Sequence, residues 1–129
     1  MEEDTITDFD TVEMDTHVYR SYITSISDGD TFTVDVDVGF GITIKKQKLR
    51  LYGINTPEVR GDSREEGKRS RDIVREKLLN KNVIIKTIKT KDDMEKKGKY
   101  GRYLAIVFLD GKNMNDWIIK NALGVAAEY

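Results

Sequence analysis

The sequence predicts an α+β fold, mainly β, in which five strands form a small barrel and two helices pack against it. Five stretches are rich in β-branched and aromatic residues, which favour strands. Two other stretches carry apolar residues at helical spacing. Along the chain these elements come as three strands, a helix, two strands and a helix. That order is the arrangement of the OB-fold, a five-stranded, partly open barrel.

Three strands are expected in the first half of the chain, at residues 18–27, 31–38 and 42–54. Asp28-Gly29, between the first two strands, is a strong hairpin-turn pair. The second strand alternates between apolar and polar residues, as a strand with one buried face does. In the third strand the apolar phase shifts between Ile44 and Leu49, which predicts a β-bulge at residues 45–48.

The second half of the chain is expected to hold two helices and two strands. A helix is expected at residues 68–79, after a polar loop at residues 59–68, because Ile73, Val74 and Leu78 share one helical face. The remaining strands are expected at residues 83–90 and 102–109, and the second helix at residues 113–122 with Gly124 as its stop. The last strand is nearly all apolar, which predicts burial on both of its faces.

Charge is distributed unevenly along the 129 residues. Residues 1–17 carry seven acidic side chains and no lysine or arginine, and they are expected to form a flexible arm. Residues 18–129 are expected to form one folded domain, and they hold 22 basic and 16 acidic side chains, a net charge of +6. A basic domain suits a polyanionic partner such as nucleic acid, although a well-solvated surface explains the same charge.

Several classes of protein are disfavoured by composition. The sequence has no cysteine, which excludes disulfides and thiolate metal sites. No apolar run approaches the length of a membrane span, so no membrane association is expected. The acidic first residues lack the charge of a secretory leader, which predicts a cytoplasmic protein unless a leader was removed. We expect a monomer.

Two short motifs carry side chains suited to phosphate chemistry. Arg50, in the third predicted strand, can hold a phosphate through its two-pronged guanidinium, and Glu58, just beyond that strand, can accept a proton. Asp28 and Asp30 flank the first hairpin turn and offer carboxylate oxygens of the kind that hard cations bind. Each motif alone has a plainer explanation as a turn or an edge strand.

A third motif, Lys99-Tyr100-Gly101-Arg102, stands at the start of the last predicted strand. Its ring can stack on a base and its cations can hold phosphate, although alone it reads as a solvated loop. Together the three motifs supply acidic oxygens, two guanidiniums and a glutamate. Phosphodiester hydrolysis needs these groups, because cations offset the charge of the five-coordinate phosphate while a carboxylate positions or deprotonates water.

The order of the motifs DGDT, RLYGINTPE, KYGR and DGKNMN resembles the staphylococcal nuclease, or thermonuclease, family. The resemblance runs from about Tyr22 to Tyr129. It implies an OB-fold barrel with packed helices that hydrolyses DNA and RNA with Ca²⁺ and leaves 3′-phosphate ends. Little sequence preference is expected, because the motifs hold groups that bind phosphate and stack on bases but no evident reader of base edges.

The resemblance also implies roles for nine residues. Arg50 and Arg102 match the family's phosphate-binding arginines, and Glu58 matches its proposed general base. The metal ligands implied are Asp30, which matches the principal carboxylate, Asn55, and Thr56 through its backbone carbonyl. The residues implied to line the bound nucleotide are Lys99, Tyr100 and Tyr129.

Two positions depart from the family pattern. Asn55 stands where the family has its second calcium carboxylate, so one ligand charge is missing. Ala127 stands where the family has the first of two tyrosines. A nucleic-acid-binding OB-fold module without effective catalysis is therefore the alternative to an enzyme. The presence of Arg50, Glu58 and Arg102 favours the enzyme.

Overall fold

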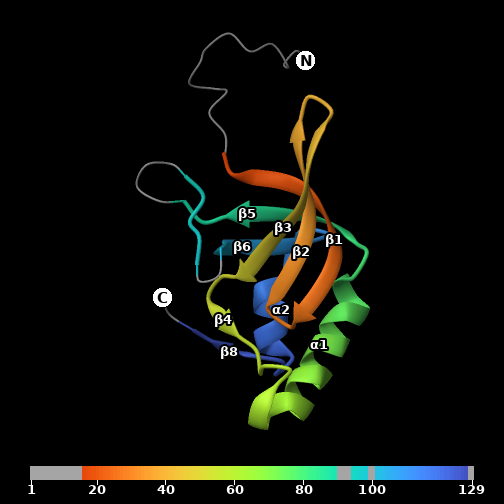
Figure 1. Cartoon of the computed structure of the whole chain (residues 1–129), viewed down its shortest axis with the longest axis vertical. Coiled ribbons are helices and arrows are strands. Elements are labelled where there is room, and N and C mark those ends of the chain that lie inside the picture. Colours follow the sequence, from red (N-terminus) through yellow and green to blue (C-terminus); the bar gives the residue numbers. More distant parts are fainter. Residues whose placement is uncertain (1–15, 90–93, 99–100, 128–129) are drawn as a thin grey trace.

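Five strands close into a barrel in the computed structural model, which describes residues 16–89, 94–98 and 101–127 (Figure 1). The barrel strands are β1 (Val18–Asp28), β2 (Thr31–Gly39), β3 (Ile42–Leu51), β5 (Asn82–Thr87) and β6 (Tyr103–Leu109). The sheet order is β3-β2-β1-β5-β6, extended by the short β7 (Lys112–Asn113), and β3 also pairs with β6. With helices α1 (Arg64–Leu78) and α2 (Met114–Lys120), this confirms the predicted barrel with two helices.

The pairing that closes the barrel differs from the others. Strand β3 runs parallel to β6, with Arg50 opposite Leu104, whereas the other strand pairs of the barrel are antiparallel. The end of β3 therefore lies beside the start of β6. A second sheet pairs β4 (Ile54–Asn55) with β8 (Val125–Ala126) just below this point (Figure 1).

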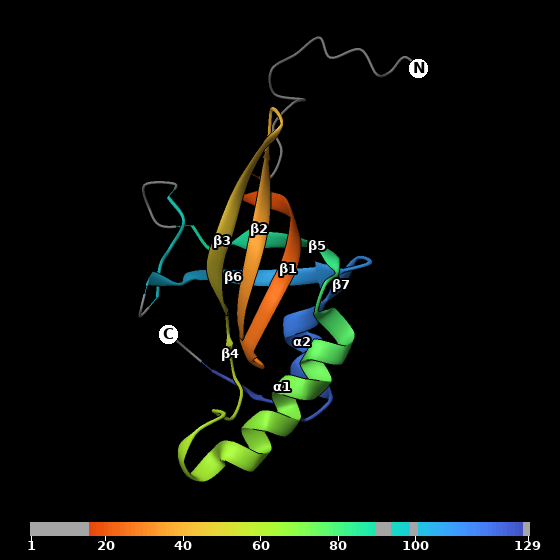
Figure 2. The same cartoon turned by 45° about the vertical axis from the view of Figure 1, so that its right-hand side comes forward.

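The core fills the barrel and continues to the helices. Both helices lie toward one end of the barrel, and the β2–β3 hairpin extends beyond the other end (Figures 1 and 2). Buried core residues come from the strands and from the inner faces of the helices: Ile23, Phe32, Val34, Leu49, Leu51, Ile85, Val107, Val74, Leu78, Met114 and Ile118. Burial of these side chains provides most of the stabilisation of such a small domain.

The predicted strands are close to the observed ones. The predicted bulge is confirmed, because Val34 pairs with Gln47 but Val36 pairs with Ile44, and Lys46 has a φ of 58°. Three other features differ from the prediction. The third strand ends at Leu51 and not at residue 54, and the fourth ends at Thr87 and not at residue 90. Strand β6 was expected to be buried on both faces, yet only Leu104, Ala105 and Val107 are buried and its other four residues are half-buried.

The helix boundaries were less well predicted. A loop was expected at residues 59–68, but helix α1 begins at Arg64, so the prediction is wrong for residues 64–68. Gly67 lies inside this helix. Glycine is needed at this position because a Cβ there would stand 2.0 Å from the carbonyl oxygen of Glu58. Helix α2 ends at Lys120, before the predicted end, and Gly124 is not its stop. Gly124 packs instead against Asn55, whose carbonyl oxygen would be 2.7 Å from an added Cβ.

Two further expectations concern the ends of the chain and membranes. Residues 1–15 of the predicted acidic arm lie outside the described residues, so the arm stays a prediction. In the part of the chain that is described, neither helix is long and apolar enough to cross a membrane.

Asn115 on α2 joins the helix to the barrel. It is 4% exposed, its Oδ1 accepts from the N–H of Val107 at 3.1 Å, and its Nδ2 donates to the carbonyls of Tyr52 at 2.9 Å and Ala105 at 3.2 Å. We expect Asn115→Ala to lower the free energy of unfolding by about 3 kcal/mol, because buried backbone groups lose their partner. Urea denaturation measures the change.

The matched control is Asn121→Ala at the end of the same helix. Asn121 is exposed and makes one hydrogen bond, from Nδ2 to the carbonyl of Trp117 at 2.8 Å. Its replacement should cost less than about 1 kcal/mol. Equal losses in the two variants would contradict a special role for Asn115.

Candidate functional site

The guanidinium of Arg50 lies against the carboxylate of Asp30 at one end of the barrel. Nη1 of Arg50, near the end of β3, is 3.1 Å from Oδ2 of Asp30 in the β1–β2 turn, and Asp30 is 6% exposed. The N–H of Leu51 also donates to the Asp30 carbonyl at 2.9 Å. A carboxylate is costly to bury unless it is paired, so the ion pair offsets the cost of placing Asp30 there.

The two aspartates of the first hairpin turn hold the segment that carries Glu58. The N–H of Thr56 donates to Oδ2 of Asp30 at 2.9 Å, and the N–H of Val59 donates to Oδ1 of Asp28 at 3.4 Å. These bonds fix both ends of residues 56–59 to the barrel. The Asp28 carboxylate therefore accepts a backbone hydrogen bond, which is a structural role besides the cation binding considered from the sequence.

Arg50 also contacts the turn between β3 and β4. Its Nη1 donates to the carbonyls of Leu51 at 3.0 Å and Ile54 at 2.8 Å, and its Nη2 donates to Oδ1 of Asn55. A guanidinium presents five donors in a fixed fork, and the two N–H groups of Nη1 are shared among the carbonyls of Leu51 and Ile54 and the Asp30 carboxylate. One side chain thus links Asp30 and Asn55, two of the three predicted metal ligands.

Arg102 reaches the same place from the start of β6. Its Nη1 donates to Oγ1 of Thr31 at 3.2 Å, and the same hydroxyl donates to Oδ1 of Asp30 at 3.1 Å. The parallel pairing of β3 with β6 brings Arg102 near Arg50, although 52 positions separate them. Thr31 was missed by the sequence analysis, and its position directly after Asp30 in the DGDT motif was the available signal.

Glu58 and Thr56 differ in their exposure. The side chain of Glu58 is exposed, and its backbone carbonyl accepts a hydrogen bond from the Ser63 hydroxyl at 3.0 Å. Thr56 is 9% exposed, and its hydroxyl has no hydrogen-bond partner among the described residues. An exposed carboxylate on an anchored segment is open to water, as a proton acceptor must be.

The structure brings together six of the nine predicted site residues. Asp30, Arg50, Asn55 and Thr56 are joined by direct contacts, Arg102 joins them through Thr31, and Glu58 lies on the anchored segment. Lys99, Tyr100 and Tyr129 lie outside the described residues, so their positions stay predictions.

The oxygen atoms at this end of the barrel are of the kind that bind hard cations. Asp30 supplies one carboxylate, Asn55 an amide oxygen and Thr56 a backbone carbonyl, and Ca²⁺ takes all three types. Within the described ranges no group of three or more Asp, Glu or His side chains gathers that could hold a metal ion. The donor types therefore fit Ca²⁺, but with a single charged ligand in the predicted set.

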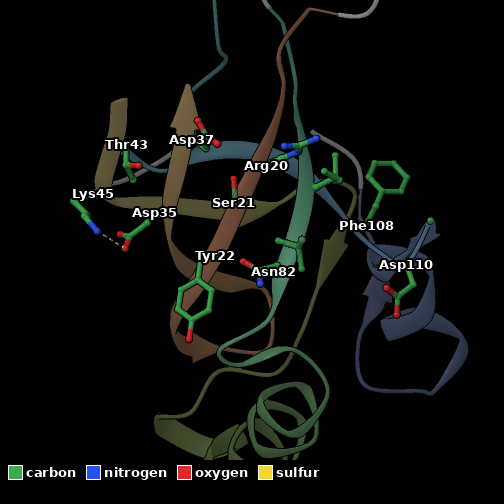
Figure 3. A pocket seen from close by; sticks show the side chains of 13 residues that line it. Arg20, Ser21, Tyr22, Asp35, Asp37, Thr43, Lys45, Asn82, Phe108 and Asp110 are labelled. Carbon is green, nitrogen blue, oxygen red and sulfur yellow. Dashed lines mark hydrogen bonds and ion pairs between the residues drawn. The ribbon is translucent and has the colours of Figure 1, made fainter. Parts of the chain in front are cut away.

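Two cavities bear on the assignment. One of about 350 Å³ is lined by Asn55, Thr56 and Glu66, next to the predicted metal ligands. Another, of about 820 Å³, lies on the outer face of the barrel and is lined by none of the nine predicted residues. Figure 3 shows this outer cavity, where Lys45 points to Asp35 at 3.4 Å while Tyr22 and Phe108 lie on opposite sides.

Comparison with known proteins addresses the family directly. A family model described as staphylococcal nuclease homologue matches residues 48–129, which include Arg50, Glu58 and Arg102. A thermonuclease of Staphylococcus hyicus is 34% identical over 107 residues, which cover 81% of this chain and 57% of that protein. A thermonuclease of Staphylococcus intermedius is 32% identical over 114 residues, covering 85% of this chain and 61% of that protein.

An uncharacterized protein of Methanocaldococcus jannaschii is also similar, with 30% identity over 120 residues that cover 78% of this chain and 54% of that protein. The chain thus spans between half and two thirds of the length of these relatives. The segment that the family model matches includes both arginines of the candidate site. Sequence, barrel topology and family model agree, and the chain belongs to the staphylococcal nuclease family.

Proposed function

We propose that this protein is a Ca²⁺-dependent nuclease that hydrolyses phosphodiester bonds of DNA and RNA with little sequence preference and leaves 3′-phosphate ends. Membership of a nuclease family supports the reaction class. The observation that carries the proposal for this chain is the meeting of Arg50 and Arg102 on either side of the Asp30-Thr31 dipeptide. Two fixed cations at one point are suited to a phosphodiester, whose charge increases in the transition state.

The two arginines would bind the phosphate. Arg50 is held by Asp30 and by backbone carbonyls, so its charge is oriented before substrate arrives. Its bond to the neutral amide oxygen of Asn55 is the contact for which a charged phosphate oxygen would compete most readily. Nη1 of Arg102 donates to the Thr31 hydroxyl at 3.2 Å, and a charged phosphate oxygen would compete for this donor.

Glu58 would take the proton from the attacking water. As the water oxygen bonds to phosphorus, the bond from phosphorus to the 5′ oxygen breaks, and the departing oxygen takes a proton from solvent. The phosphate stays on the 3′ oxygen, which gives the proposed product. The anchoring of residues 56–59 by Asp28 and Asp30 supports this role, because it would hold the carboxylate in one position, and such positioning is a large part of catalysis.

The remaining predicted residues complete the proposal. Asp30, Asn55 and the carbonyl of Thr56 would hold Ca²⁺, and the ion when bound supplies positive charge beside the phosphate. Lys99, Tyr100 and Tyr129 would contact the phosphate and bases of the nucleic acid. Contacts to the phosphate backbone and stacking carry little sequence information, which is why we propose weak sequence preference.

Digestion assays test this function. We expect plasmid DNA, single-stranded DNA and RNA to be cleaved in millimolar Ca²⁺ and to be left intact in excess chelator, because one charged ligand binds the ion weakly. End-labelling identifies the terminal phosphate. Undiminished cleavage in chelator would contradict the metal requirement. Binding of nucleic acid without cleavage by folded protein would favour the alternative, a binding module.

Two substitutions test the catalytic roles. We expect Arg102→Ala and Glu58→Gln each to lower kcat by about a hundredfold or more, because loss of one positioned charged group has effects of that size. Thermal melts should change less than activity, since Glu58 is exposed, Arg102 is half-buried and neither side chain belongs to the hydrophobic core.

The matched controls are Arg69→Ala and Glu65→Gln on exposed positions of α1. Both should keep nearly full activity. An unchanged rate in Arg102→Ala or Glu58→Gln would refute the role of that residue, whereas a collapsed melt would identify it as structural.

Asn55→Asp tests the metal site. The change adds a carboxylate beside Arg50 and Asp30, and we expect about tenfold tighter binding of Ca²⁺, which corresponds to a net gain of about 1–2 kcal/mol after desolvation and repulsion from Asp30. Activity at saturating Ca²⁺ should change little. Calorimetric titration with Ca²⁺ in the presence of a bound nucleotide measures the affinity.

The control is Asn82→Asp, which adds the same charge on the outer face of the barrel, beside the cavity of Figure 3. It should leave the Ca²⁺ affinity unchanged. Equal affinities of Asn55→Asp and the unsubstituted protein would mean that residue 55 does not face the ion.

A further inference from the structure

One carboxylate oxygen of Glu95 lies close to three other side chains. Oε1 of Glu95 accepts a hydrogen bond from the Tyr19 hydroxyl at 2.6 Å. The Thr87 hydroxyl lies 3.5 Å from the same oxygen and 3.3 Å from the His17 carbonyl, and these two acceptors share its one proton. Nε2 of His17 lies 3.7 Å from Oε1 of Glu95. Tyr19 is in β1 and Thr87 ends β5, so Glu95 is fastened to two neighbouring strands.

The surroundings make the bond between Tyr19 and Glu95 a strong one. The pair borders a cavity of about 210 Å³ whose other walls are largely apolar, including Val36, Leu49 and Ile85. Burial and the bond to Glu95 raise the pKa of Tyr19 to about 12, so its hydroxyl keeps its proton. Burial opposes the charge on Glu95, but the bond from Tyr19 and the nearby His17 outweigh it and hold the pKa of Glu95 below its ordinary value. A charged acceptor and a permanent donor form the stronger kind of hydrogen bond.

The short segment that begins at Met94 runs from this pair to the candidate site. The N–H of Lys96 donates to the carbonyl of Ile88 at 2.7 Å, and the N–H of Leu104 donates to the carbonyl of Lys96 at 2.9 Å. The N–H of Gly98 then donates to the carbonyl of Arg102 at 2.7 Å. Residues 94–98 therefore lie between the end of β5 and the start of β6.

Side-chain contacts follow the same path. Nζ of Lys97 lies 4.7 Å from the centre of the Tyr103 ring, and Lys97 and Tyr103 form an isolated β-bridge. Glu95 forms a second bridge with Lys89. The backbone of Arg102 is thus held by a segment that is itself fastened to the barrel through Glu95.

We propose that Tyr19 and Glu95 act as positioning residues for Arg102, by fastening residues 94–98 so that the backbone before β6 is fixed. The inference rests on the proposed nuclease function. Arg102 stands just before its strand, where barrel pairing holds the backbone less than in the middle of β6. A displacement of about 1 Å at a catalytic group can cost about a hundredfold in rate, so a support outside the site has a measurable effect.

The first test is kinetic and uses Tyr19→Phe, which keeps the ring and removes the hydroxyl. We expect kcat to fall about tenfold with KM within about twofold, because the loss acts on the transition state. In an Arg102→Ala background the same change should have no further effect, since a shared role is not additive. Equal losses in both backgrounds would overturn the positioning of Arg102.

Companion variants separate positioning from folding. Glu95→Gln keeps an acceptor oxygen and should retain more activity than Glu95→Ala. Tyr22→Phe, on the outward face of the same strand, should behave as the unsubstituted protein. Equal activity of the Gln and Ala variants at position 95 would overturn the role of this bond.

The second test does not depend on nuclease activity. Lys96 and Lys97 are exposed, so trypsin should cut after them faster once the segment is released. We expect Tyr19→Phe to raise the rate of cutting at these two bonds about tenfold, with the cut sites identified by mass spectrometry and Tyr22→Phe as control. An unchanged rate would overturn the fastening, whatever the activity. Absence of cleavage of nucleic acid by the unsubstituted protein would instead refute the proposed function, and the same double-mutant comparison would then be made on affinity for a single-stranded oligonucleotide.

Discussion

The ion pair between Arg50 and Asp30 is the interaction on which this end of the molecule depends. Asp30 is nearly buried, so its carboxylate needs a partner, and Arg50 supplies the charge while Thr56 supplies a backbone donor. The same guanidinium bonds the β3–β4 turn, so removing either member of the pair would leave a charge without compensation and also release the turn. The Arg50 side chain is therefore both a member of a structural ion pair and the candidate phosphate-binding group.

Closure of the barrel explains why a second arginine meets the first. Antiparallel hairpins alone would carry β3 and β6 to opposite edges of an open sheet. The parallel pairing of Leu49 with Tyr103 joins those edges and brings the start of β6 to the Asp30-Thr31 turn. Because the site forms at this parallel pairing, loss of closure would separate the two arginines.

Charge and chain geometry identify the candidate site better than cavity volume does. The outer cavity in Figure 3 is larger than the one beside Asn55, yet it is lined by none of the predicted site residues, and two of its charged groups, Asp35 and Lys45, are paired with each other. The site lies where strand ends, a hairpin turn and an anchored loop converge. Loops held by a rigid barrel are common positions for catalytic groups, since the barrel fixes them without burying them.

The sequence by itself determined the strands, the DG turn, the bulge near Lys46 and the identity of most candidate residues, because alternation, turn chemistry and short motifs are local signals. It did not determine the early start of α1, the close approach of Gly67 to the Glu58 carbonyl, or the turning of Asn55 toward Arg50. Only the tertiary structure joined Arg102 to Thr31 and Tyr19 to Glu95, across 71 and 76 positions. Contacts over such distances are set by how the barrel closes, and closure leaves no periodic trace in the sequence around either partner.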